Sequence, residues 1–397
     1  MRILPLIATL ALVSLVAGPS VVVAQPLESV RVSGDRGGFI LVPSGQPFIP
    51  WGFNYDHDSD GRLIEDYWHD RWDEVESDFR EMKRLGANVV RVHLQFGAFM
   101  LGPVEPNPGS LRQLARLVTL AEETGLYLDV TGLGCYHKQD VPPWYDALDE
   151  SDRWAAQAAF WEAVAKTCAA SPAIFCYDLM NEPVVPGGDS RRDDWLGPAF
   201  AGKHFVQFVS LDRRGRQRTE IARQWIRTLV TAIRKHDADH LITVGLVDWS
   251  LDRPGLTSGF VPEKIADDLD FIAVHIYPQQ GKIDEALDTL RGFAAVGKPV
   301  VIEEIFPLKC DTAELDRFIE ASRSLAGDGA SGASGWIGFY WGKTAQEYRQ
   351  GPQTISAAIT RDWLEWFERK TPELLAKPKS PVDAHENPSD DATQADR

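Results

Sequence analysis

The chain is predicted to be an α/β protein built as a (β/α)8 (TIM) barrel. Eight short β-rich runs alternate along it with stretches whose apolar residues recur every three to four positions. Near-continuous apolar strands that alternate with amphipathic helices are typical of a parallel sheet covered by helices. Eight such units within 397 residues fit a closed barrel better than an open doubly wound sheet.

The predicted strands are short and rich in β-branched and aromatic residues. The first ends near Asn54, and the others are NVVRVHL (88–94), LYLDVTG (126–132), AIFCYDLM (173–180), HLITVGLV (240–247), FIAVHIY (271–277), KPVVIEEI (298–305) and GWIGFYW (335–341). Ahead of the first strand, β-rich runs separated by Gly turns in the segment from residue 28 to 48 predict a short N-terminal β-hairpin.

Helical periodicity lies between these strands, at 72–85, 111–124, 152–169, 218–236, 284–295, 312–326 and 356–369. The interval between the fifth and sixth strands, residues 248–269, is too rich in Pro and Gly to predict a regular helix. A long insertion at 184–217 follows the fourth strand. It is expected to form a loop at the end of the barrel that carries the active groups.

Both ends of the chain differ in composition from the part between them. Residues 1–24 combine one Arg, an apolar run and Val22-Val23-Ala24, which predicts a signal peptide cleaved after Ala24 and a secreted or periplasmic protein. An uncleaved anchor is disfavoured because Gly18 and Pro19 interrupt the run. The catalytic barrel domain is predicted at 25–375, and the polar tail at 376–397 is predicted to be disordered.

Charge and cysteine usage exclude several classes of partner. Asp and Glu outnumber Lys and Arg by 58 to 41, and without a basic stripe no nucleic-acid partner is expected. The four cysteines form no C-x-x-C pair or Cys/His cluster, so we expect no structural zinc, no other metal and no cofactor. Cys168 and Cys176 could form a disulfide or remain buried thiols. Nothing in the sequence indicates an oligomeric state.

Polar residues gather where the predicted strands end, and in a barrel of this type those ends meet at one mouth. Glu182 ends strand four and Glu303-Glu304 ends strand seven. Two carboxylates facing one cleft are what hydrolysis of a glycosidic bond requires, because one protonates the leaving oxygen while the other meets the developing positive charge. An Arg beside the second carboxylate would lower its pKa and keep it ionised.

Five features in order along the chain resemble glycoside hydrolase family 5, which includes cellulases and β-mannanases. They are VRVHL, the Asn-Glu-Pro that ends strand four, HIY, the Glu that ends strand seven, and a Trp in the last strand. The resemblance covers about residues 45 to 370 and implies a retaining enzyme with Glu182 as acid/base. It further implies substrate-site roles for Asn181, Arg91, His275, Tyr277 and Trp341.

Two further polar residues are placed at the cleft by their position alone. Asn54 ends the first strand, and His137 follows the third. His137 and its neighbour Tyr136 lie in a predicted loop, where lining of the cleft and ordinary loop packing are equally consistent with the sequence. His93, in the middle of strand two, is either a core histidine or a cleft group.

The nucleophile is one of two adjacent residues, Glu303 and Glu304. Strand alternation cannot choose between them, because both faces of VVIEEI are otherwise apolar. Family members commonly read Glu-Phe-Gly or Glu-Tyr-Gly at this point. Aligning Ile305 with the aromatic residue selects Glu304.

The resulting prediction is a retaining β-glycosidase that uses Glu304 and Glu182 and cuts β-1,4-linked mannan or glucan internally. The substrate class comes from the resemblance alone. Two alternatives remain: a carbohydrate-binding protein that has lost turnover on the same scaffold, and a transglycosylase that uses the same residues.

Overall fold

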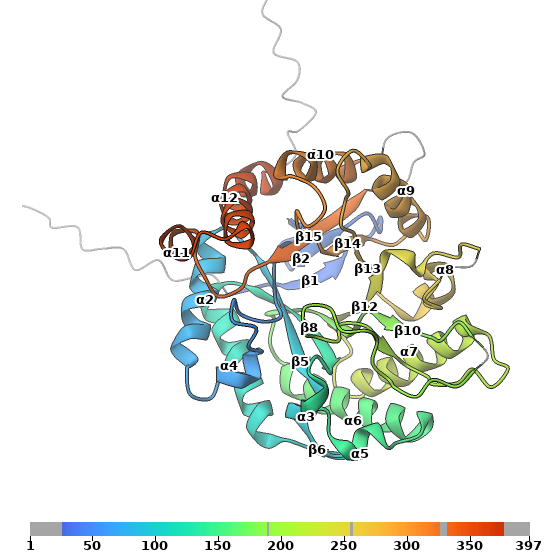
Figure 1. The fold of residues 1–397 in the computed structure, drawn as a ribbon. Helices are drawn as coiled ribbons and strands as arrows, with labels where there is room; N and C mark the ends of the chain where they lie inside the picture. The colour runs from blue at the N-terminus through green and yellow to red at the C-terminus, as the bar shows by residue number, and fades with distance from the viewer. Residues whose placement is uncertain (1–25, 189, 255–256, 326–331, 377–397) are drawn as a thin grey trace, which may run out of the picture.

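The computed structural model describes residues 26–188, 190–254, 257–325 and 332–376, and the predicted leader and the tail from residue 377 lie outside them. The centre of the molecule is a closed eight-stranded barrel with helices around it (Figure 1). In barrel order its strands are β4 (Trp51–Tyr55), β5 (Val89–Gln95), β8 (Tyr127–Gly134), β9 (Ile174–Asn181), β12 (Leu241–Val247), β13 (Ile272–His275), β14 (Val300–Glu304) and β15 (Ala333–Phe339). The (β/α)8 prediction is confirmed, and each barrel strand falls on a predicted run.

Long helices cover the outside of the barrel at the predicted positions. They are α2 (Trp72–Arg84), α4 (Pro108–Thr124), α6 (Glu150–Cys168), α7 (Arg218–Arg234), α9 (Ile283–Ala294), α10 (Thr312–Arg323) and α12 (Ile355–Leu375). Between β12 and β13 the described residues form only the one-turn helix α8 (Pro262–Ile265) and short 3-10 turns, as the Pro and Gly content predicted. The short helices elsewhere are α1 (Ile64–Tyr67), α3 (Phe96–Phe99), α5 (Pro143–Asp146) and α11 (Ala345–Gln350).

The predicted N-terminal hairpin is present and closes the bottom of the barrel. Strands β1 (Ser29–Val32) and β2 (Phe39–Val42) pair antiparallel, and β3 (Pro47–Phe48) adds a third strand. Phe39 packs edge-on against Phe175 and Phe271 at the start of β9 and just before β13, with ring centroids 5.2 and 5.3 Å apart. These aromatic contacts leave the opposite end of the barrel as its mouth.

The insertion after β9 lies against that mouth, as expected. Its strand β11 (Gln207–Phe208) pairs with β10 (Pro183–Val184), and the amide of Gln207 donates to the carbonyl of Glu182 at 3.3 Å. The carbonyl of Phe205 accepts from the side-chain amide of Asn181 at 3.2 Å. The loop therefore packs directly on the Asn-Glu-Pro turn. A small hairpin, β6 (Met100–Gly102) with β7 (Glu105–Pro106), lies in the connection from β5 to α4.

Two irregularities in the barrel bring extra polar side chains into its interior. On β9, Asp178 pairs with Thr243 and Asn181 with Gly245, so two residues of β9 lie opposite one of β12. On β14, Ile302 pairs with Val274 but Glu304 pairs with His275, which leaves Glu303 as the extra residue. A bulge of this kind breaks strict alternation and redirects side chains near the end of a strand.

Cys168 and Cys176 are buried free thiols, which is one of the two states the sequence allowed. Within the described part of the chain, no helix has both the length and the apolar character needed to cross a bilayer.

Candidate active site

Glu182 lies just beyond β9, in a backbone conformation that L-residues rarely adopt. Its φ of 49° is in the left-handed region, and its amide donates to the carbonyl of Gly245 at 2.9 Å. Such a conformation costs about 1–3 kcal/mol and persists only where surrounding contacts impose it, most often at functional sites. Here the pairing with β12 and the contact with the insertion hold the turn.

Glu304 ends β14 and is held by two donors. Oε1 accepts from Arg91 Nη1 at 3.1 Å, and Oε2 accepts from the Tyr277 hydroxyl at 2.6 Å. The side chain is largely buried but still partly exposed, whereas Glu303 is fully buried in the barrel interior. Of the two adjacent carboxylates, Glu304 is the one at the mouth, as the sequence alignment favoured.

The carboxylates of Glu182 and Glu304 face each other across His275. One oxygen of each, together with a ring nitrogen of His275, all lie within 4.8 Å of one another. Nδ1 of His275 is 3.0 Å from Glu182 Oε1 and 3.5 Å from Glu304 Oε2. A retaining glycosidase needs carboxyl groups about 5–5.5 Å apart, against about 6.5–9.5 Å for inversion. The observed approach fits retention.

Burial and the neighbouring opposite charges shift the pKa values of His275 and Glu304 in opposite directions. Burial alone would lower the pKa of His275, but Glu304, Glu182 and Glu303 raise it to about 10. Burial raises the pKa of Glu304, and His275 and Arg91 only partly offset this, so the net shift is upward. Arg91 lowers the pKa of this carboxyl as expected, but burial outweighs that effect. The desolvation cost exceeds the attraction of the two cations.

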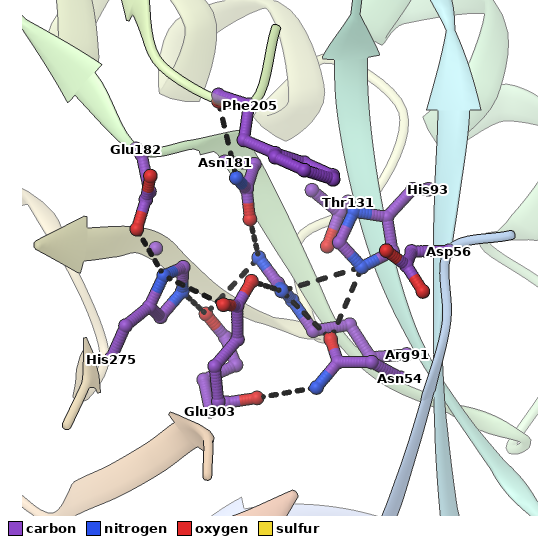
Figure 2. A network of polar contacts seen from close by, with 12 residues as sticks. Asn54, Asp56, Arg91, His93, Thr131, Asn181, Glu182, Phe205, His275 and Glu303 are labelled. Carbon is purple, nitrogen blue, oxygen red and sulfur yellow. Dashed lines mark hydrogen bonds and ion pairs between the residues drawn. The ribbon is translucent and has the colours of Figure 1, made fainter. Parts of the chain in front are cut away.

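Arg91 is the hub of the polar network in Figure 2. Its guanidinium is fully buried and donates from Nη1 to Asn54 Oδ1 at 2.8 Å and to Glu304, and from Nη2 to Asp178 at 2.6 Å and to Asn181 at 3.0 Å. The planar fork of Arg suits several acceptors at fixed angles, which a Lys could not serve. Arg91 thus fixes the positions of groups from three other barrel strands, β4, β9 and β14.

Two residues predicted to bind substrate lie beneath the mouth instead. Asn54 is fully buried and donates to the carbonyls of Glu303 and Gly338 at 2.8 and 2.9 Å, so its prediction as a sugar contact is wrong. Arg91 is likewise closed off from a sugar and acts through Glu304. Asn181 is nearly buried, with one amide proton donated to Phe205 (Figure 2).

Trp341 lies at the edge of the mouth and is held by Asp56 and His57. Its indole Nε1 donates to Asp56 Oδ1 at 3.3 Å, and its ring stacks on that of His57 with centroids 5.8 Å apart. The indole is only partly buried, so it can still offer surface to a sugar. Asp56 was not singled out from the sequence, because a carboxylate just after an apolar strand gave no spacing signal.

His137 does not join the carboxylate pair. Its Nδ1 is 3.3 Å from Asp140, and it lines a side cavity of about 290 Å³ with Gln95 and Cys135. Its neighbour Tyr136 is the residue that enters the site, where its hydroxyl bonds His93 and its ring meets Phe205 edge-on at 5.0 Å. The sequence left cleft lining and loop packing open for His137, and the structure places it in this side cavity, while Tyr136 contacts His93.

The interior carboxylates Asp129 and Asp178 were missed as site residues, and Glu303 was considered only as a nucleophile. Asp178 accepts from Arg91 and from the hydroxyl of Thr131 at 2.9 Å, while Asp129 and Glu303 lie deeper. An acidic residue inside a predicted apolar strand was the available signal, in LYLDVTG and FCYDLMNEP.

Two cavities lie beside residues of the mouth, and neither is lined by Glu182 or Glu304. One of about 440 Å³ is lined by Trp341, His57 and Tyr348, and one of about 380 Å³ by Tyr277, Asp248 and Arg253. Asp248 is exposed in the second cavity and begins a 3-10 turn.

A closed (β/α)8 barrel with two carboxylates facing each other at the C-terminal mouth is the arrangement of a barrel glycoside hydrolase. The family model described as "Cellulase (glycosyl hydrolase family 5)" matches residues 44–320. The chain therefore belongs to glycosyl hydrolase family 5, a family of retaining enzymes.

Relatives of known name agree with this membership. Mannan endo-1,4-β-mannosidase A of Podospora anserina is 25% identical over 279 residues, which are 62% of this chain and 65% of that protein. The fold resembles an exo-β-1,4-mannosidase from Opitutaceae bacterium strain TAV5, at 19% identity and a TM-score of 0.63, over 86% of this chain and 62% of that one. It also resembles a β-1,4-mannanase from the sea hare Aplysia kurodai, at 15% identity and a TM-score of 0.59, over 88% and 97%. The chain spans less than two thirds of the first two relatives.

Proposed function

We propose that the protein is a retaining β-glycoside hydrolase that cuts β-1,4-linked mannan or glucan within the chain, with mannan favoured. The observation that carries this proposal is the approach of Glu182 and Glu304 to within 4.8 Å, with Tyr277 and Arg91 holding Glu304. Glu304 is the nucleophile and Glu182 the acid/base. Mannan is favoured because the relatives named above are mannanases and mannosidases.

In the first step an oxygen of Glu304 bonds to the anomeric carbon as the bond from that carbon to the leaving oxygen breaks. The proton of Glu182 moves to the leaving oxygen, which departs as an alcohol. In the second step Glu182, now a carboxylate, takes a proton from water. The water oxygen bonds to the anomeric carbon, the ester bond breaks, and Glu304 returns to the carboxylate form.

Internal cleavage needs room for sugar units on both sides of the scissile bond. Trp341 and Tyr277 border cavities of about 440 and 380 Å³, which we take as the two directions in which the sugar chain continues. Secretion is part of the same proposal, on the basis of the leader at residues 1–24 and because a polymer of this kind is met outside the cell.

The test uses mannan, β-glucan, xylan and an aryl β-mannoside with a good leaving group. Glu304→Gln should lose activity on all of them. Glu182→Gln should lose mannan hydrolysis yet still release the phenol in a first burst, because that leaving group needs no proton, and intact-mass measurement should detect the glycosyl-enzyme. Proton NMR should show the β-anomer as first product. Equal slow release by both variants and the unsubstituted protein would instead indicate a binding protein, and products lengthened in the presence of added oligosaccharide would indicate a transglycosylase.

A further inference from the structure

Beneath the two catalytic carboxylates lies a second pair of carboxyl groups that the proposed reaction does not use. Asp129 of β8 and Glu303 of β14 are both fully buried. They lie within hydrogen-bonding reach of each other. No donor of the described residues bonds any of their four oxygens. Two ionised carboxylates so close together and so deeply buried would repel each other strongly.

The surroundings hold too few positive charges to balance every acid in the ionised form. The cations that face this pair are Arg91 of β5 and His275 of β13, at 3.5 and 3.6 Å from Glu303 Oε2. Asp178 of β9 takes up Arg91 Nη2 at 2.6 Å, and Glu304 takes up Nη1. Cys176 of β9 also lies against Asp129 and brings no positive charge. At least one acid of the group is therefore expected to keep its proton.

The neighbours of each carboxyl group show which one keeps it. Burial tends to raise both pKa values, but Arg91 and His275 bring the pKa of Glu303 below its usual range. Burial and the charge of Glu303 raise the pKa of Asp129 well above its usual range. Of the two, only Glu303 contacts both cations, so Glu303 gains more from ionising than Asp129 does.

We propose that Asp129 and Glu303 share one proton, carried by Asp129 as a donor to Glu303, and that the Glu303 carboxylate keeps His275 as an imidazolium beneath Glu182 and Glu304. Asp129 and Glu303 are then positioning residues of the glycosidase. This inference rests on the proposed function for its effect on catalysis. The protonation states themselves can be measured without any turnover.

The barrel makes room for this arrangement at Gly245. A Cβ at that position would lie 3.0 Å from Glu303 Oε2, 3.1 Å from His275 Nε2 and 2.9 Å from Arg91 Nη2. The bulge on β14 supplies the other half, because it brings Glu303 into the interior next to Glu304. Gly245 on β12 therefore leaves the space that the carboxylate of Glu303 occupies, and the bulge on β14 brings that carboxylate into the interior.

A fixed imidazolium suits the proposed reaction because the negative charge moves during it. In the first step the charge leaves Glu304, which becomes an ester, and appears on Glu182, which has lost its proton. In the second step it returns. Nδ1 of His275 lies 3.0 Å from one carboxylate and 3.5 Å from the other, so the same cation stabilises both states.

Titration of His275 depends on more than Glu303, and the other groups facing it must be considered. Glu182 and Glu304 remain in every variant below. The remaining charged or titratable neighbours are Arg91 and His93 on β5, Asp248 after β12 and Tyr277 after β13. None of these groups could take the place of the Glu303 carboxylate beside Nε2 of His275. Among the described residues, that nitrogen has no hydrogen-bond partner.

The experiment compares Glu303→Gln with Asp129→Asn. Asn at 129 keeps an N–H donor toward Glu303, so the basic limb of kcat/KM should stay where the unsubstituted protein has it. Gln at 303 removes the anion beside Nε2 of His275. The basic limb of the kcat/KM profile should therefore move to lower pH by at least about one unit. Loss of kcat/KM should therefore grow to about tenfold or more as the pH rises through that interval.

Nitrogen NMR of protein labelled at histidine reports the protonation state of His275 directly. A purely structural role of Glu303 would leave that state unchanged. With His275→Gln to assign its signals, His275 should be an imidazolium at pH 8 in the unsubstituted protein and in Asp129→Asn, and neutral in Glu303→Gln. The reverse pattern, in which Asp129→Asn neutralises His275 and Glu303→Gln does not, overturns the proposal. A neutral His275 in the unsubstituted protein also overturns it. If no glycan is hydrolysed, the proposed function fails, yet these spectra still decide the protonation states.

Discussion

The hydroxyl of Tyr277 donates a 2.6 Å hydrogen bond to Oε2 of Glu304, from the loop after the neighbouring barrel strand. This bond favours the ionised form of Glu304 against the burial that opposes it. It also leaves Oε1 to Arg91, so each oxygen of the proposed nucleophile has its own donor.

Tyr277→Phe should therefore reduce kcat/KM and move its acidic limb to higher pH. A hydrogen bond to a charged group contributes about 1.5–3 kcal/mol, which corresponds to a loss of about ten- to a hundredfold. The sign follows from the role of Glu304, which must be ionised to attack. Removing a group that lowers its pKa leaves it protonated up to a higher pH. A pH profile of aryl mannoside hydrolysis measures this.

The matched control is Tyr340→Phe, because the Tyr340 hydroxyl bonds Asp78 at 3.2 Å, away from the carboxylate pair. That variant should change thermal stability without moving the acidic limb. An unchanged limb in Tyr277→Phe would show that the hydroxyl does not influence Glu304.

Arg91→Lys should lower both stability and activity although it conserves the charge. A Lys ammonium is a point charge and cannot donate at once to Asn54, Asp178 and Glu304 in the positions the guanidinium occupies. Breaking a buried ion pair costs about 3–5 kcal/mol. Denaturant unfolding and kcat together test this. Arg153→Lys, at a buried Arg that donates to the carbonyl of Tyr145, should lose stability with little effect on kcat.

Glu182→Gly should be more stable than Glu182→Ala, although both should be inactive on mannan. At a φ of 49° a Cβ is strained and glycine is not, which favours Gly by about 1 kcal/mol or more. Both substitutions remove the same carboxylate, so the difference reports the backbone alone. Thermal unfolding of the two variants side by side would show it, and an Ala variant as stable as the Gly variant would mean that this turn stores no strain.

Gly52→Ala should severely destabilise the barrel. A Cβ on Gly52 of β4 would lie 1.7 Å from the carbonyl oxygen of Val89, which is backbone of the neighbouring strand and cannot move aside. We expect a loss in the free energy of unfolding of about 3 kcal/mol or more. Gly38→Ala, where a Cβ would meet nothing within 4 Å, is the control and should unfold at nearly the same denaturant concentration as the unsubstituted protein.

Much of the site could be predicted because it lies at strand ends, and strand ends are marked in the sequence. Arg91 and His93 are two positions apart on strand β5, where alternation puts both side chains on one face, and they lie 3.3 Å apart. The direction of the His137 side chain could not be predicted in this way, because His137 lies in a loop, where no strand alternation applies. Asn54 was assigned correctly to a strand end, but its depth in the barrel depends on neighbours far away in the chain.

The order of eight strand–helix units and the mouth at which their polar ends meet followed from the amino-acid sequence alone, because apolar periodicity and strand ends are local properties. The strand ends also narrowed the candidate carboxylates to Glu182 and the adjacent pair Glu303 and Glu304. Which glutamate of the adjacent pair faces the mouth was decided by the closed barrel. The bulge that brings Glu303 inside arises from pairing with β13, and the proton we assign to Asp129 depends on charges from four different strands. Register and burial are properties of the assembled barrel, and no single stretch of the chain contains them.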